Sequence, residues 1–95
     1  MSKSIIQKDT SRCFLCGGTV GLEEHHIFGG ANRKWSEKYG LKVMLCGIKC
    51  HREGKDSAHK NRKTADSLKR LGQIAFEAKH GCREKFMSIF GKNYL

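Results

Sequence analysis

The chain has 95 residues and a net charge of +10, with 19 lysines and arginines against 9 acidic residues. Its length predicts one domain, and Leu, Ile, Val and Phe make up only about a fifth of it, so we expect a small core that needs a disulfide or metal staple. No segment approaches the roughly 18 apolar residues of a membrane span, so we expect no membrane-spanning helix.

The excess of positive charge favours a polyanionic partner, and nucleic acid in particular. No segment combines a basic face with the strong hydrophobicity of a membrane-surface helix. The first ten residues also lack the apolar run of a signal peptide, so we expect a protein of the reducing cytoplasm. Clustered cysteines in that compartment bind metal more often than they form disulfides.

Residues 1–12 are polar and basic apart from Ile5 and Ile6, and we expect an N-terminal arm there. The arm either contacts phosphate or is a tail without a role. Residues 13–95 are predicted to form a single domain, with a metal-binding core at residues 13–65 and a helical extension at 66–95.

Two pairs of cysteines have the spacing of metal ligands, Cys13 with Cys16 and Cys46 with Cys50. Four thiolates complete the tetrahedral ligand set of a structural zinc ion, so we predict one zinc site from these pairs. The main variant replaces Cys50 with His51 as the fourth ligand. Cys82 lies outside the cluster and is predicted to be a surface thiol.

Alternating apolar residues predict one strand leading into the Glu24-His25-His26 segment, broken by Gly29-Gly30, and another over residues 41–46. Between them, residues 34–39 predict a short helix that ends at Gly40. Adjacent histidines on a strand point to opposite sides. Histidine both ligates metals and exchanges protons near neutral pH, so the pair is a candidate for catalysis.

A helical stripe follows, in which the apolar residues Ala65, Leu68, Leu71, Ala75 and Ala78 recur every three or four positions. It predicts a long helix over residues 57–80, capped by Asp56 or Ser57. A last short helix is predicted over residues 83–90. Together the elements predict a small, zinc-stabilised α+β domain.

The motifs Cys-x2-Cys, Glu-His-His-Ile and Leu-Cys-x3-Cys-His occur in that order within residues 13–65, which resemble the HNH endonucleases. The small basic form is similar to the compact HNH proteins of phages and prophages, whose compartment is the cytoplasm of the host cell. The resemblance implies a ββα-metal finger, followed here by a long and a short helix. It also implies metal-dependent hydrolysis of phosphodiester bonds in DNA.

The resemblance implies that His25 and His51 bind a catalytic ion and that His26 is the general base. His59 is a further ligand if residues 52–55 form an inserted loop, and otherwise faces solvent. The ion is Mg²⁺, Mn²⁺, Ni²⁺ or Zn²⁺. The family's middle asparagine, which orients the base, has no clean match: Asn32 and Asn61 are the nearest, and a backbone carbonyl is the alternative.

Basic side chains flank these motifs and are candidates for binding DNA phosphates: Arg33, Lys34, Arg52, Lys55, Lys60, Arg62 and Lys63. Two interpretations without catalysis stay open. One is a zinc-finger module that binds nucleic acid or acts as an adaptor, and the other is a protein-interaction domain with two structural zinc ions. If the protein is a nuclease, a protein partner that supplies targeting is also open.

Overall fold

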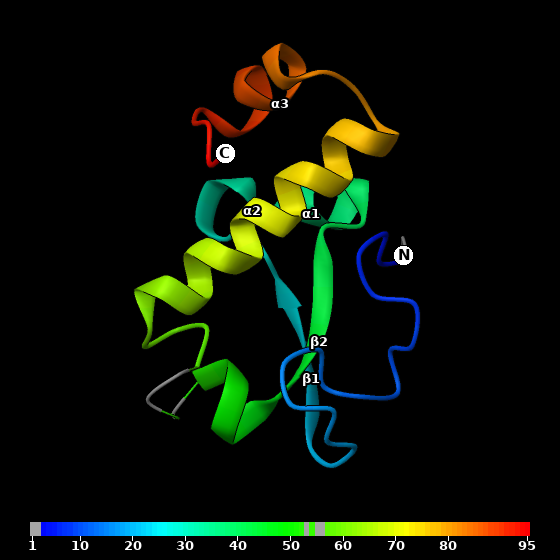
Figure 1. Cartoon of the computed structure of the whole chain (residues 1–95), viewed down its shortest axis with the longest axis vertical. Coiled ribbons are helices and arrows are strands. Elements are labelled where there is room, and N and C mark those ends of the chain that lie inside the picture. Colours follow the sequence, from blue (N-terminus) through cyan, green and yellow to red (C-terminus); the bar gives the residue numbers. More distant parts are fainter. Residues whose placement is uncertain (1–2, 53, 55–56) are drawn as a thin grey trace.

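The structure, a computed structural model, describes residues 3–52, 54 and 57–95. Its elements follow the chain as β1 (Leu22–His26), η1 (Gly30–Asn32), α1 (Arg33–Tyr39), β2 (Lys42–Cys46), η2 (Gly47–Arg52), α2 (Arg62–Lys79) and α3 (Arg83–Phe90). The predicted α+β fold, with two strands and three helices, is therefore confirmed. The two strands β1 and β2 form a hairpin whose connection contains η1 and α1. In Figure 1, η2 lies at one end of this hairpin, and α1 and α3 lie toward the other.

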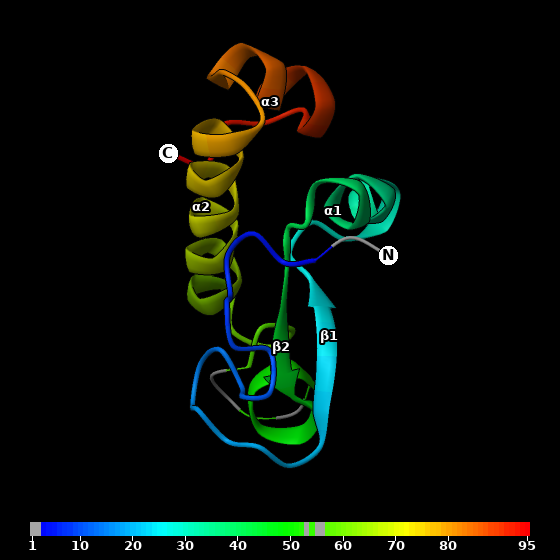
Figure 2. The same ribbon diagram turned by 90° about the vertical axis from the view of Figure 1, so that its right-hand side faces the viewer.

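The strands β1 and β2 pair antiparallel, with His25 opposite Val43 and His26 opposite Lys42. Because side chains alternate along a strand, His25 and His26 point to opposite faces of the sheet. On β2, Val43 shares the face of His25 and is buried, together with Leu45. Figure 2 shows α2 on one side of the sheet, mostly level with α1, and its buried face includes Leu68 and Phe76.

The N-terminal arm lies along the edge of β2 that β1 leaves open. The Met44 amide donates to Oε1 of Gln7 at 2.8 Å, and the Met44 carbonyl accepts from the Phe14 amide at 2.8 Å. Gln7 is buried, and its side-chain nitrogen donates to the carbonyls of Asp9 and Arg12. Residues 5–14 are thus tied to the strand by one buried glutamine and by backbone hydrogen bonds.

The expected start of the long helix was wrong. The helix α2 begins at Arg62, and its cap is Asn61, whose side chain accepts a hydrogen bond from the Thr64 amide at 3.2 Å. Residues 57–60 instead form a separate turn in which Ser57 is fully buried. The other candidate cap, Asp56, lies outside the described residues. The short helices α1 and α3 follow their predictions closely, and each ends at a glycine with positive φ, Gly40 or Gly91.

The buried face of α2 also differs from the predicted stripe. Leu68 is buried as expected, but Leu71 is 41% exposed, and Gly72 and Phe76 face the core instead. A Cβ atom on Gly72 would lie 3.0 Å from the ring of Phe28. The helix therefore turns its smallest residue toward Phe28, where a larger side chain would meet tight contacts.

Among the described residues, no helix has the length and hydrophobicity that a membrane span requires.

Candidate metal centres and the His26 pocket

The structure brings the four predicted cysteine ligands together. The sulfur atoms of Cys13, Cys16, Cys46 and Cys50 all lie within 4.8 Å of one another, and those of Cys16 and Cys46 are 3.7 Å apart. Cys13 and Cys16 come from the loop before β1, Cys46 ends β2, and Cys50 lies in η2. The group can hold a metal ion such as zinc, which accords with the prediction from the sequence.

The loop around Cys13 is built to hold a thiolate. The amide of Gly17 donates to the Cys13 carbonyl at 2.9 Å, and Gly17 has a φ of 76°, which closes a tight turn. The Cys16 amide points at the Cys13 sulfur from 3.4 Å. Burial opposes ionisation of this thiol, but hydrogen bonds from the amides of Cys16, Cys46 and Leu15 prevail and lower the pKa of Cys13 to about 6.

Cys50 shows the opposite behaviour. Burial, followed by hydrogen bonds that the Cys50 thiol donates to the neighbouring sulfurs, raises the pKa of Cys50. Four sulfurs this close cannot all be ionised without a cation among them, because thiolates repel one another. A bound divalent ion removes that repulsion, so metal binding and thiol deprotonation are coupled at this site.

A second group consists of three histidines, His25, His51 and His59, each with a ring nitrogen within 4.8 Å of the other two. Their ring centroids are 5.1 Å apart for His25 and His51, 5.6 Å for His25 and His59, and 4.7 Å for His51 and His59. His25 comes from β1, His51 from η2, and His59 from the turn before α2. The His59 amide donates to the His51 carbonyl at 3.2 Å, which holds the two segments together.

The environment of His25 keeps its imidazole neutral. His25 is 9% exposed, and burial lowers its pKa to about 4, helped by the nearby charges of His51 and His59. A neutral imidazole offers the lone pair that a metal ion needs, so His25 is ready to act as a ligand at neutral pH.

His51 is oriented by a carboxylate. Its Nδ1 atom lies 2.8 Å from Oε1 of Glu23, which leaves Nε2 available to a metal ion. Gly47 makes this contact possible, because a Cβ atom there would lie 2.7 Å from the Glu23 carboxyl carbon. The sequence motifs do not reveal Glu23, whose only signal is its position two residues before His25, on the same face of the strand.

His26 lies on the other face of the sheet and does not join the three-histidine group. Its Nε2 atom is 2.9 Å from Oε2 of Glu37, and the same oxygen accepts a hydrogen bond from Lys42 at 2.9 Å. Lys42 also pairs with Glu24 at 3.3 Å. Burial tends to lower the pKa of Lys42, but the hydrogen bonds to Glu37 and Glu24 raise it, so the ammonium stays charged.

An open pocket of about 380 Å³ surrounds His26. It is lined by Glu24, His26, Arg33, Lys34 and Glu37. The two predicted phosphate-binding residues at the start of α1 therefore lie beside the predicted base.

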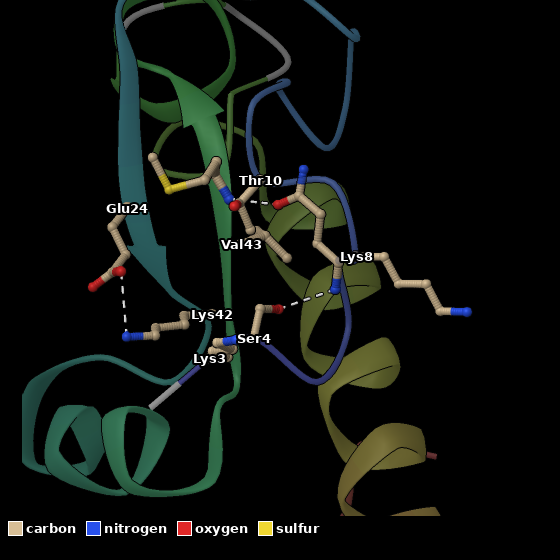
Figure 3. Close-up of a pocket in the computed structure, with 9 residues that line it drawn as sticks. Lys3, Ser4, Lys8, Thr10, Glu24, Lys42 and Val43 are labelled. Atoms are coloured by element: carbon tan, nitrogen blue, oxygen red, sulfur yellow. Dashed lines mark hydrogen bonds and ion pairs between the residues drawn. The ribbon is translucent and has the colours of Figure 1, made fainter. Parts of the chain in front are cut away.

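A neighbouring pocket of about 470 Å³ lies between the N-terminal arm and this face of the sheet. Figure 3 shows Glu24 and Lys42 joined by their ion pair at its wall, and Lys8 extending away from the strands. Glu24 lines both pockets, so the two hollows adjoin on the face of the sheet that carries His26.

The remaining basic candidates lie near the start of α2, where Lys60, Arg62 and Lys63 are exposed. Arg62 pairs with Asp66 one helical turn away, at 3.7 Å. The side chain of Arg52 and the whole of Lys55 lie outside the described residues.

The two asparagines nearest to the family's middle position make other contacts. The Asn32 amide donates to the Phe90 carbonyl at 3.4 Å, and Asn61 caps α2.

No family model, curated protein or solved structure matches the chain.

Proposed function

We propose that the protein is a metal-dependent endonuclease of the HNH type, which hydrolyses phosphodiester bonds in DNA. The observation that carries the proposal is the group of three imidazoles next to a separate group of four cysteines. Four thiolates already satisfy a structural zinc ion, whereas three protein ligands leave a coordination position open, as catalytic zinc sites do.

The donor set fits some metals better than others. Imidazole nitrogens suit zinc and nickel, whereas magnesium prefers oxygen ligands and keeps several of its waters. Of the four ions expected from the sequence, we therefore propose Zn²⁺ or Ni²⁺, held by His25, His51 and His59. When bound, such an ion supplies positive charge that stabilises negative charge developing on a phosphate oxygen.

The protein's own residues supply the remaining requirements of the reaction. His26 accepts a proton from the attacking water, a role that side chains with accessible lone pairs perform at typical gains of about 10²–10⁴-fold. Arg33 and Lys34 line the same pocket and neutralise phosphate charge. His25 and His26 are consecutive at the end of β1 and point to opposite faces of the sheet.

The alternative is a zinc-stabilised module that binds nucleic acid, or acts as an adaptor, without cutting. One observation favours it: the His26 pocket opens on the face opposite His25, and its lining includes none of the three clustered histidines. Under this alternative, the charge of +10 serves binding alone and the histidine group holds a second structural ion.

A plasmid-nicking assay tests the proposal. Protein with zinc at the four cysteines is incubated with supercoiled DNA and, in turn, Mg²⁺, Mn²⁺, Ni²⁺ or additional Zn²⁺. We expect cleavage with Ni²⁺ or Zn²⁺, and a loss of at least about 100-fold in His26→Ala. His80→Gln is the matched control and should cut normally, because His80 belongs neither to the three-histidine group nor to the lining of the His26 pocket.

Zinc content and circular dichroism of each variant show whether it has folded. Equal cleavage by His26→Ala and the unmodified protein would remove His26 from the mechanism. Tight DNA binding without cleavage in any of the four metals would establish the non-catalytic alternative instead.

A further inference from the structure

Building on the proposed function, we infer that Glu37 is the positioning residue of the general base. Its carboxylate binds the proton on Nε2 of His26 and thereby leaves Nδ1 as the atom that accepts a proton from water.

The contact itself fixes the tautomer. Oε2 of Glu37 lies 2.9 Å from Nε2 of His26, within hydrogen-bonding distance. Hydrogen bonds from Lys42 and then from His26 lower the pKa of Glu37, so the carboxylate is ionised at neutral pH and can only accept. The nitrogen that faces it must carry the proton. The other nitrogen of a neutral imidazole then holds the lone pair.

A buried lysine holds Glu37 in place. Lys42 is 4% exposed, and its ammonium donates to the same Oε2 atom from 2.9 Å while also pairing with Glu24 at 3.3 Å. Lys42 is also the cross-strand neighbour of His26. The imidazole and the ammonium thus meet one carboxylate from two strands, which restricts the rotation of all three side chains.

Charged groups from both strands and from α1 surround His26. Glu24 and Glu37 bring two negative charges and Lys42 brings one positive charge, and Arg33 and Lys34 line the same pocket. A carboxylate beside a catalytic imidazole stabilises the imidazolium that forms when the base accepts a proton. Glu37 is the carboxylate in that position beside His26.

The ligand atoms of Glu24, His26 and Glu37 lie within 4.8 Å of one another, which also suggests a metal site. Lys42 argues against a cation there, because its ammonium already contacts both carboxylates. Asn32 and Asn61 are both committed to other contacts. Of Glu37 and the two asparagines, Glu37 is thus the one whose side chain meets the ring of the proposed base.

The test combines a spectroscopic and a kinetic measurement. Long-range ¹H–¹⁵N correlation spectra of the zinc-loaded protein report which nitrogen of His26 carries the proton. We expect the Nε2–H form in the unmodified protein and in Glu37→Gln, whose amide oxygen still accepts a hydrogen bond. In Glu37→Ala we expect a shift toward the Nδ1–H form. Glu84→Ala, a change at an exposed glutamate in α3, is the matched control.

Nicking kinetics with the metal that supports cleavage give the second readout. Glu37→Ala should lower kcat by at least about tenfold with little change in the KM for DNA, and Glu37→Gln should recover most of that loss. An Nδ1–H tautomer in the unmodified protein would overturn the inference whether or not Glu37→Ala folds. A kcat that does not change in a folded Glu37→Ala variant would also overturn it.

The two proposals can fail separately. If the Nε2–H tautomer depends on Glu37 but the unmodified protein cuts no DNA, Glu37 orients His26 and the nuclease assignment is wrong. If the protein cuts DNA and the tautomer does not depend on Glu37, the nuclease assignment stands and the inference about Glu37 is wrong.

Discussion

At the scale of single residues, a histidine is paired with a glutamate on each face of the hairpin. Glu23 contacts His51 on the face that carries the three-histidine group, and Glu37 contacts His26 on the other face. In each case the carboxylate binds one ring nitrogen and leaves the other for chemistry. A carboxylate therefore orients the proposed metal ligand His51 on one face and the proposed base His26 on the other.

Replacing Glu23 with alanine should weaken metal binding at the three-histidine group by about 10–100-fold, because His51 loses the partner that orients its ring. Titration calorimetry with Ni²⁺, on protein whose four cysteines are already filled with zinc, measures the effect. Glu84→Ala should bind Ni²⁺ normally. An unchanged affinity in Glu23→Ala would show that the contact with His51 does not support a metal site.

Residues whose roles follow from local spacing were predicted well. The four cysteines were expected to converge, and they do, because short loops bring each pair together and the hairpin joins the pairs. Glu23 and Glu37 were missed because their partners lie 28 and 11 residues away. Contacts at those separations depend on how η2 and α1 pack on the hairpin, which no motif in the sequence records.

At the scale of elements, the periodicity predicted the helix α2 correctly but gave the wrong residues for its buried face. The sequence predicted the helix, but the apolar stripe included Leu71, which is exposed, and it omitted Phe76, which is fully buried. Gly72 decides the orientation by admitting the ring of Phe28 at close range. The start was also misplaced, because the turn over residues 57–60 is bonded to η2 through the amides of Ala58 and His59.

Gly72→Ala is expected to destabilise the fold, although alanine favours helix by about 1 kcal/mol over glycine. The added Cβ would meet Phe28 at 3.0 Å and Ile27 at 3.2 Å, and overpacking typically costs about 1–3 kcal/mol. Phe28 cannot move aside easily, because its ring packs against Phe90 at a centroid distance of 4.5 Å. We therefore expect a net loss of about 1 kcal/mol.

Urea unfolding of zinc-loaded protein measures this change. Ser67→Ala is the matched control, since Ser67 is an exposed residue of the same helix and its replacement improves helix propensity without touching the core. If the urea midpoint rises in both variants, Phe28 and Ile27 move aside to make room for the new methyl group, and the prediction is wrong.

At the scale of the whole molecule, the four-cysteine group connects segments that a small core alone would hold weakly. It joins the loop before β1, the end of β2 and η2. Because His51 directly follows Cys50, a metal ion held by the cysteines would also place one member of the three-histidine group. We therefore expect the fold and the proposed catalytic site to depend on the same ion.

Loss of that ion should unfold the protein. Structural zinc contributes on the order of 10 kcal/mol in small domains, which is comparable with the entire stability of a typical fold. Cys13→Ser, or treatment with a strong chelator, should abolish the cooperative thermal transition seen by circular dichroism. Cys82→Ser, at an exposed cysteine outside the group, should melt like the unmodified protein. Identical melting of the two serine variants would show that the cysteines are not a structural centre.

The arm that covers β2 has a consequence for how molecules of this protein meet each other. Met44 turns its amide and its carbonyl away from β1, and Gln7 and Phe14 satisfy both. Without the arm, the Met44 amide would lose Gln7 and be open to a strand of a second molecule, as groups on uncovered edge strands are. We expect a chain that lacks residues 3–12, but keeps all four clustered cysteines, to self-associate, which light scattering would detect. Such self-association would show that the arm also protects the protein against aggregation.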